Sequence, residues 1–179
     1  MNIEEKKILA EGRYLRLVRR DRWEYAERVN ASSAVIIIAV TPDDKLLFVE
    51  QFRVPMNANC IEMPAGLVGD LDADDTMESA ARRELIEETG WQADHVQVLI
   101  VGPSSAGMSN EIIAFVRASG LTKVSEGGGD ASENIIVHEV PRTEVPRWLA
   151  QKMAEGYSLD PKLWAGLWLL ERNPDGSLA

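Results

Sequence analysis

The sequence predicts an α/β fold, a mixed β-sheet between helices in an α/β/α sandwich, preceded by a small N-terminal β subdomain. The run AVIIIAV at residues 34–40 is typical of a strand that is buried on both faces. Residues 76–89 carry a helical pattern between predicted strands, and two more helical segments close the chain. Strands on either side of a central helix, with helices at the end, favour the sandwich.

The first 30 residues are predicted to form the separate β subdomain. This segment is strongly charged, and apolar residues such as Leu15, Leu17 and Trp23 are spaced through it. We expect two strands that turn near Arg20 and Asp21. Residues 31–179 then form the main domain.

The elements of the main domain follow in order. A turn at residues 41–44 leads from the first buried strand to a second. The helix at 76–89 is expected to begin with a capping box of Asp75 and Glu78 and to end at Gly90. The remaining predicted elements are strands at 45–52, 95–101, 111–116 and 134–140, and helices at 142–156 and 161–172. Residues 125–130 contain three consecutive glycines and are expected to form a mobile loop.

Composition and charge limit the classes of partner. The 19 Lys and Arg against 29 Asp and Glu give a net charge of −10, which argues against a nucleic-acid backbone as partner. The longest apolar run is too short to span a membrane, and the first residues have no secretory pattern. The single cysteine, Cys60, predicts a reducing cytoplasm. A phosphate-bearing substrate would therefore need a metal ion held by carboxylates.

Three carboxylates gather on the helix predicted at 76–89. Glu84 and Glu88 are four residues apart and so lie one above the other, with Glu87 to one side. Ala80 shares the sector of Glu84 and Glu88, which indicates that this sector faces the protein. Hard oxygen ligands in this number suit Mg²⁺ or Mn²⁺, and a solvated glutamate-rich surface is the alternative. Arg83 is expected to pair with Glu87 four residues later.

The surroundings of this helix resemble the signature of the Nudix hydrolases, Gly-x5-Glu-x7-Arg-Glu-U-x-Glu-Glu-x-Gly-U, in which U is a bulky apolar residue. Pro-Ala-Gly at 64–66 and Arg-Glu-Leu-Ile-Glu-Glu-Thr-Gly-Trp at 83–91 carry the resemblance. Asp75 stands where the family has its first Glu. Eight residues separate Gly66 from Asp75 where the family has five, and Gly69 would restore that spacing.

The resemblance implies the α/β/α sandwich of that family and a metal-dependent hydrolysis of nucleoside diphosphates linked to another moiety. The metal ligands that it implies are the carbonyl of Ala65 and the side chains of Glu84, Glu87, Glu88 and Glu133. The catalytic residues that it implies are Glu133, Glu87 and Arg83. Glu133 is the first choice for the general base, followed by Asp130 and Glu126.

Within the family, the chain is similar to the ADP-ribose and nucleotide-sugar pyrophosphatases. The stretches that carry this similarity are Glu-Gln-Phe-Arg at 50–53, Glu-Met-Pro-Ala-Gly at 62–66 and Trp-Glu-Tyr-Ala-Glu-Arg at 23–28. The resemblance implies that Arg53 meets a phosphate, with Glu62 and Glu111 on the substrate side. It also implies that Trp23 and Arg28 hold the base, across a dimer interface formed by exchanged N-terminal strands.

Ala106 is a departure, because it replaces the Pro that marks ADP-ribose specificity in that group. The expected reaction is therefore the cleavage of ADP-ribose or a related nucleoside diphosphate sugar into a nucleoside monophosphate and a sugar phosphate. The expected enzyme is a cytoplasmic homodimer with Mg²⁺ or Mn²⁺ and with no nucleic-acid or membrane partner. One alternative is a pyrophosphatase for a dinucleotide such as NADH or for coenzyme A. The other is a domain that senses ADP-ribose without cleaving it, against which the full set of glutamates argues.

Overall fold

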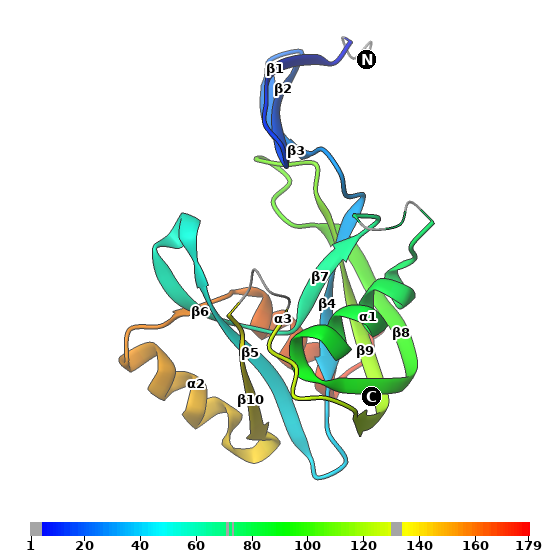
Figure 1. Cartoon of the computed structure of the whole chain (residues 1–179), viewed down its shortest axis with the longest axis vertical. Helices are drawn as coiled ribbons and strands as arrows, with labels where there is room; N and C mark the ends of the chain where they lie inside the picture. The colour runs from blue at the N-terminus through cyan, green and yellow to red at the C-terminus, as the bar shows by residue number, and fades with distance from the viewer. Residues whose placement is uncertain (1–4, 71, 73, 130–133) are drawn as a thin grey trace.

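The computed structural model describes residues 5–70, 72, 74–129 and 134–179. Within these residues the chain forms three β-sheets and three α-helices (Figure 1). The strands of the central sheet, in order, are β7 (Ala65–Val68), β4 (Ser33–Ala39), β9 (Ile112–Lys123) and β8 (Trp91–Pro103). Strands β4 and β9 run parallel and the other pairs antiparallel, so the sheet is mixed as predicted.

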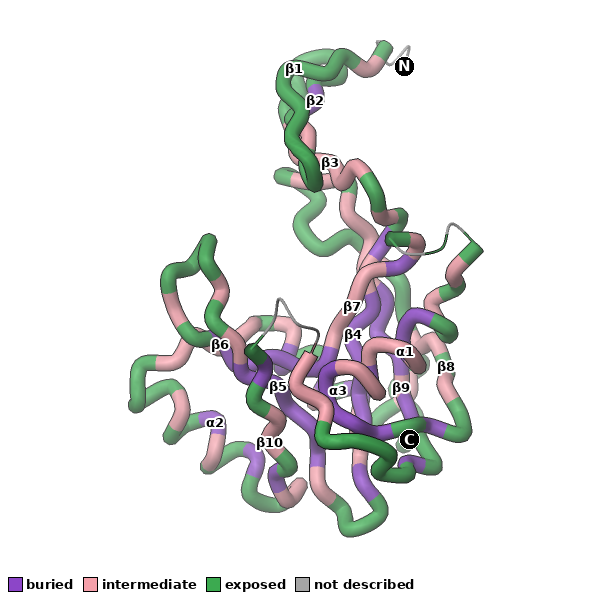
Figure 2. The backbone as a smooth tube through the Cα atoms, viewed as in Figure 1, coloured by how far each residue is buried: buried purple, intermediate pink, exposed green. Residues whose placement is uncertain are grey.

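Strand β4 is buried on both faces, which confirms the prediction from its apolar run. Val35 and Ile37 belong to one core cluster, which includes Leu85 of the first helix. Ile36 and Ile38 belong to a second cluster, which includes residues of the second main sheet, described below, and of the last two helices. Figure 2 shows the buried backbone concentrated between the two main sheets and the helices.

The second sheet holds β5, which carries Arg53 at its end. Its strands, in order, are β10 (Ile136–Pro141), β5 (Lys45–Arg53), β6 (Ala58–Glu62) and β11 (Ser158–Leu159). The 3₁₀ turns are η1 (Val54–Met56), between β5 and β6, and η2 (Arg142–Glu144), before α2. Helices α2 (Val145–Ala154) and α3 (Lys162–Glu171) confirm the two helices predicted at the end of the chain, with shorter bounds.

Helix α1 (Met77–Thr89) begins one residue later than predicted, and its capping box is a different one. Thr76 has an extended backbone and accepts a hydrogen bond from the Ser79 N–H, while the Ser79 hydroxyl accepts from the Thr76 N–H. The predicted box of Asp75 and Glu78 is therefore wrong, because the turn into the helix places Thr76 at the cap. The predicted end is confirmed, since Gly90 takes the left-handed conformation with φ 74°.

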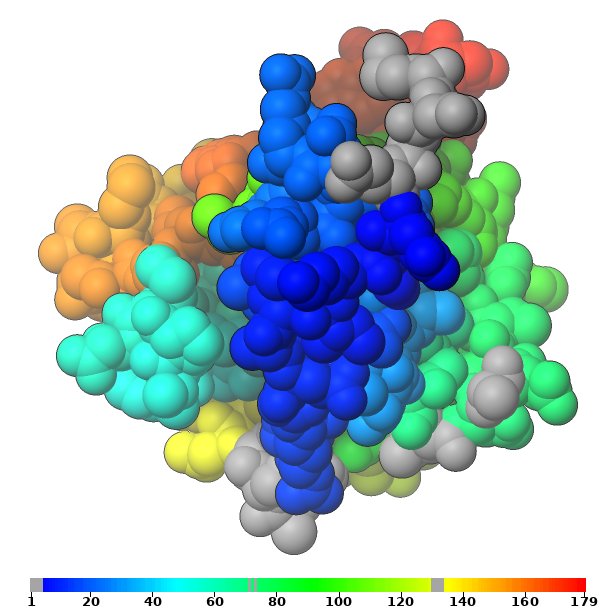
Figure 3. All heavy atoms as spheres, turned by 90° about the horizontal axis from the view of Figure 1, so that it is seen from above, coloured from blue at the N-terminus to red at the C-terminus, as the bar shows by residue number. Residues whose placement is uncertain are grey.

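The N-terminal sheet has three antiparallel strands where the sequence predicted two. They are β1 (Lys7–Glu11), β2 (Leu15–Arg20) and β3 (Trp23–Arg28). The predicted turn lies between β2 and β3, where Asp21 has φ 55°. Strand β1 was missed because all of its residues are exposed, so it has no buried face to create an alternating pattern. This sheet projects away from the main body and stands over it as a ridge when viewed from above (Figures 1 and 3).

Three further strands, β6, β7 and β11, had not been predicted, and β8 and β9 extend beyond their predicted bounds. Strand β7 is only four residues long and contains Gly66, so its pattern is too short to read. In the described part of the chain, no helix is both long enough and apolar enough to cross a membrane.

Candidate active site

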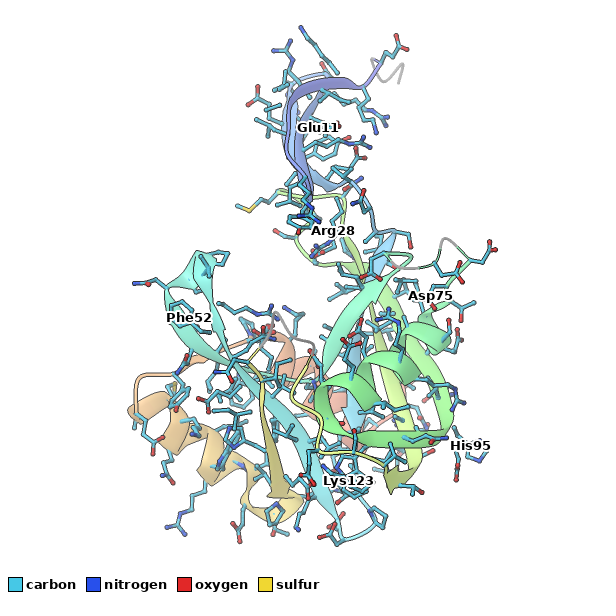
Figure 4. All side chains as sticks on the ribbon, in the orientation of Figure 1. Glu11, Arg28, Phe52, Asp75, His95 and Lys123 are labelled. Atoms are coloured by element: carbon cyan, nitrogen blue, oxygen red, sulfur yellow. The ribbon has the colours of Figure 1, made fainter. Side chains whose placement is uncertain are left out.

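A cleft of about 400 Å³ lies where α1, the two main sheets and the base of the N-terminal sheet meet. Figure 4 shows Arg28 at the base of the N-terminal sheet and Asp75 just before α1. Carboxylates and cations both line the cleft. The charged side chains of functional interest in the cleft are Arg28, Arg53, Glu62, Arg83, Glu84, Glu87, Glu88, Glu111 and Lys162. The backbone of Ala65 and Gly66 also lines it.

The turn of α1 that carries the glutamates faces the protein, as its spacing predicted. Ala80 is buried beneath it, and Glu88 is 4% exposed. One oxygen of Glu88 accepts a hydrogen bond of 3.0 Å from the backbone N–H of Ala65. This bond ties the helix to the start of β7, whose Ala65 carbonyl was expected to be a metal ligand.

Glu84 lies against the backbone of Gly66, where a Cβ atom would collide with the Glu84 carboxyl group. Burial removes water from this carboxylate and raises its pKa to about 7, although Arg83 acts in the opposite direction. Gly66 thus lies against a glutamate of α1, whereas a Cβ at Gly69 would meet Ser32 and Asp72.

Arg83 pairs more closely with Glu84 than with the predicted partner, Glu87. One terminal nitrogen lies 2.7 Å from Glu84 Oε1 and 3.9 Å from Glu87 Oε2. The other nitrogen donates to the Leu67 carbonyl at 3.1 Å and lies 3.4 Å from Asp75. The hydrogen bond to β7 holds the side chain of Arg83 away from its predicted partner. Asp75, which stands at the position of the family's first Glu, also contacts this side chain.

The oxygen atoms on the α1 side of the cleft, called the metal wall below, fit a hard divalent cation. Glu84, Glu87 and Glu88 offer carboxylate oxygens and Ala65 offers a carbonyl, which are the ligands that Mg²⁺ and Mn²⁺ prefer. Among the described residues, no group of three or more acidic, His or Cys side chains is arranged so that it could hold a metal ion. The pKa of Glu84 is raised first by burial and then by repulsion from Glu87 and Asp70, and a cation bound at this carboxylate would favour its charged form.

Each of two arginines in the cleft is braced by a glutamate. Arg53 donates from Nε and Nη2 to the two oxygens of Glu62, both at 2.7 Å. Arg28 donates from Nε to Glu111 at 2.6 Å. Burial acts to raise the pKa of Glu111, but hydrogen bonds from Ser104 and Arg28 outweigh it and hold the pKa below its ordinary value. Glu62 and Glu111 therefore contact the arginines of the site.

Trp23 does not line this cleft. It lies with Tyr25 in a separate, mainly apolar pocket of about 550 Å³, which Ala106 also lines, and it is 54% exposed. The side chains of adjacent strand residues point to opposite faces, which separates this pair from Arg28 on the other face of β3. The structure thus does not bring Trp23 and Arg28 together within one chain.

Lys162 lines the cleft although no motif marked it. It is the first residue of α3, and its ammonium group lies 2.5 Å from Asp160. The available signal was a Lys directly after Pro161, where a helix was predicted to begin. That position on a helix does not by itself reveal which cavity the side chain meets.

The glycine-rich loop, which is predicted to be mobile, is hydrogen-bonded to α1 in the structure. The backbone N–H groups of Gly128 and Gly129 donate to the carbonyls of Glu88 and Glu87, at 2.8 and 3.1 Å. Glu126 is exposed in the same segment. The first choice for the general base, Glu133, and the second, Asp130, lie outside the described residues.

A family model of the NUDIX domain matches residues 31–156, most of the chain. The chain belongs to the Nudix family. A solved structure titled as that of an ADP compounds hydrolase has the same fold, with a TM-score of 0.70 and 21% sequence identity over 94% of this chain and 91% of that one. The Nudix resemblance and the fold class predicted from the sequence are both confirmed.

Curated relatives carry several names. A methanol dehydrogenase activator of Bacillus methanolicus is 34% identical over 70% of this chain and 67% of its own length. An ADP-ribose pyrophosphatase of Bacillus subtilis is 35% identical over 56% of this chain and 52% of its own length. A GDP-mannose pyrophosphatase of Yersinia enterocolitica is 35% identical, over 66% and 64%. The matches thus span about half to two-thirds of these relatives.

Proposed function

We propose that this Nudix protein hydrolyses the pyrophosphate bond of ADP-ribose or a related nucleoside diphosphate sugar, with Mg²⁺ or Mn²⁺ as cofactor. The observation that carries the proposal is a single cleft that joins a wall of three glutamates to the braced arginines Arg28 and Arg53. Carboxylates suit metal ions, and guanidinium groups suit phosphate oxygens. The names of two relatives, an ADP-ribose and a GDP-mannose pyrophosphatase, support the same substrate class.

Glu84, Glu87, Glu88 and the Ala65 carbonyl would hold the metal, and Arg83 orients Glu84 through its 2.7 Å contact. When bound, such a cation polarises phosphate oxygens and lowers the pKa of bound water. Glu133 is the proposed base or further ligand, which its place before β10 supports.

Arg53 and Arg28 are the proposed substrate cations. Glu62 holds Arg53 by two parallel hydrogen bonds, so the guanidinium is fixed before substrate arrives. Lys162 adds a positive charge to the same cleft. These residues would attract a pyrophosphate despite the net charge of −10.

We further propose that the protein is a cytoplasmic homodimer in which residues 1–30 supply the interface and the base contact. Exposed apolar side chains on the N-terminal sheet support this: Ile8, Leu15, Leu17 and Trp23 are each more than one-third exposed. Trp23 does not line the cleft of its own chain, so it would contact a base bound in the cleft of a second copy.

The test is release of phosphate, with alkaline phosphatase as coupling enzyme, from ADP-ribose, ADP-glucose, GDP-mannose, UDP-glucose, NADH and coenzyme A. Each is assayed with Mg²⁺ and with a chelator. We expect Mg²⁺-dependent cleavage of ADP-ribose or of several nucleotide sugars. Preferred cleavage of NADH or coenzyme A would instead assign the protein to dinucleotide or coenzyme A pyrophosphatases. Binding of ADP-ribose without turnover would favour the alternative of a domain that senses ADP-ribose.

Two variants test the proposed ligands within this assay. Glu84→Gln and Glu88→Gln should each lower kcat by about 100-fold or more, because each removes a negative oxygen from the metal wall. Glu78→Gln is the matched control, since Glu78 lies exposed in the first turn of the same helix. Near-wild-type rates in the first two variants would remove the proposed metal site.

A further inference from the structure

The last carbonyls of α1 are all satisfied, although a helix leaves its final four without partners in the helix itself. Gly90 N–H donates to the carbonyl of Ile86 at 2.8 Å, and Lys123 Nζ donates to that of Thr89 at 2.9 Å. The carbonyls between them belong to Glu87 and Glu88, whose side chains face the cleft. These two accept hydrogen bonds from the glycine-rich segment that follows β9.

This segment, residues 124–129, is called the strap below. It starts on the helix cap, where the N–H groups of Val124 and Ser125 both donate to the Gly90 carbonyl, at 2.8 and 3.1 Å. It continues along the final turn of α1 through the Gly128 and Gly129 bonds described above. It is then tied to the chain entering β10, because Ile135 N–H donates to the Gly128 carbonyl at 3.2 Å.

The contact between strap and helix requires glycine at Gly127. A Cβ atom there would lie 2.5 Å from the Thr89 carbonyl carbon, 2.6 Å from the Glu88 carbonyl oxygen and 2.7 Å from the Gly90 nitrogen. These are backbone atoms, so they cannot turn aside as the end of a side chain can. Gly127 also has φ 73°, which a residue with a Cβ rarely adopts.

We propose that the strap is a positioning device, with Gly127 as its positioning residue. It holds the turn that carries Glu87 and Glu88 at a set distance from the chain that enters β10. No residue of the strap lines the cleft, and the strap acts through its hydrogen bonds to the backbone carbonyls of Glu87 and Glu88. This inference rests on the proposed function, since that function assigns the glutamates to a metal.

Gly127→Ala forces the strap away from α1 and is the first test. We expect Mg²⁺ affinity, measured by calorimetry, to fall by at least about tenfold, and kcat to fall with a smaller change in KM. Gly156→Ala is the matched control, because Gly156 has φ 92° but nothing within 4 Å of an added Cβ. It reproduces the backbone strain without the collision. Equal Mg²⁺ affinity in the two variants would overturn the proposal.

Amide hydrogen exchange in the wild-type protein tests the strap without any variant, in case Gly127→Ala does not fold. If the strap and the metal ligands are coupled, saturating Mg²⁺ must slow exchange at Gly128 and Gly129, because such coupling is reciprocal. No change in exchange at these two amides on adding Mg²⁺ would overturn the coupling. The measurement needs no turnover, so absence of hydrolysis on every substrate would defeat the proposed function and leave this result standing.

Discussion

Gly66 shows how one missing side chain can matter to the site without mattering to the fold. A Cβ there would collide with the carboxyl end of Glu84, which is flexible and can move aside. Gly66→Ala should therefore retain its melting temperature while kcat falls by about 100-fold, because Glu84 is displaced from its place on the metal wall. Kinetics and thermal unfolding on the same samples check both parts.

Gly102→Ala is the control for this prediction. Gly102 lies within β8, and an added Cβ would meet nothing within 4 Å. A comparable loss of activity in both variants would show that the effect is general to glycine in a strand. A loss of stability in Gly66→Ala alone would show that Glu84 cannot move.

Glu62 should act through Arg53, because its two oxygens accept hydrogen bonds from Nε and Nη2 of that guanidinium. Glu62→Gln removes the charge of a side chain that is 11% exposed. We expect KM to rise by about tenfold with kcat nearly unchanged. A loosely held Arg53 would weaken binding of the substrate and of the transition state by the same amount. Steady-state kinetics on the best substrate of the panel measure the split.

An exposed pair provides the comparison for Glu62. Arg142 and Glu171 lie 2.8 Å apart, but Glu171 is 61% exposed and far along α3 from the cleft. Glu171→Gln should leave both constants at wild-type values. A fall in kcat without a rise in KM in Glu62→Gln would instead assign Glu62 to the chemical step.

At the scale of elements, α1 depends on its observed cap. Thr76 is exposed, and its hydroxyl oxygen accepts the Ser79 N–H at 3.1 Å. Thr76→Ala should lower the free energy of unfolding by about 1 kcal/mol, because one N–H at the helix start loses its partner. Chemical denaturation measures this, and Thr76→Ser should restore most of the loss. Equal losses in the two variants would mean that the hydroxyl is not the cap.

The same helix shows which features could be predicted from the sequence. Its glutamate-bearing sector was predictable because four-residue spacing fixes a shared face wherever the helix packs. Its first residue was off by one because Asp75 and Thr76 are both good caps, and the fold of the preceding loop decides between them. Strand β4 was predictable from its apolar run, whereas β1 lacks any buried face.

Contacts between distant segments were not predictable in this way. Three glycines predict conformational freedom, but the docking of Gly128 and Gly129 on α1 depends on how β9 delivers them. Lys162 reaches the cleft because α3 begins beside it, which helical periodicity does not indicate. The expected pairing of Arg83 with Glu87 followed the local rule, and β7 drew the arginine toward Glu84.

At the scale of the whole molecule, the separation of Trp23 from Arg28 yields a test of assembly. Trp23 lies in its own pocket beside residues 103–112, and Arg28 lies in the cleft. If the base is held by Trp23, the tryptophan must come from a second copy. We expect the wild-type protein to sediment as a dimer, and Leu17→Glu, on the exposed N-terminal sheet, to sediment as a monomer. Leu178→Glu, at a more exposed leucine near the C-terminus, should remain dimeric.

Mixed dimers decide whether Trp23 acts on its own chain or on its partner. Trp23→Ala and Glu84→Gln are each expected to be weakly active alone. A co-expressed dimer of the two has one site with both Glu84 and a tryptophan only if the tryptophan is supplied by the partner. Random pairing then restores about a quarter of the wild-type rate. No recovery in purified mixed dimers would show that Trp23 of one chain does not serve the cleft of the other, and the exposed apolar sheet would then need another explanation.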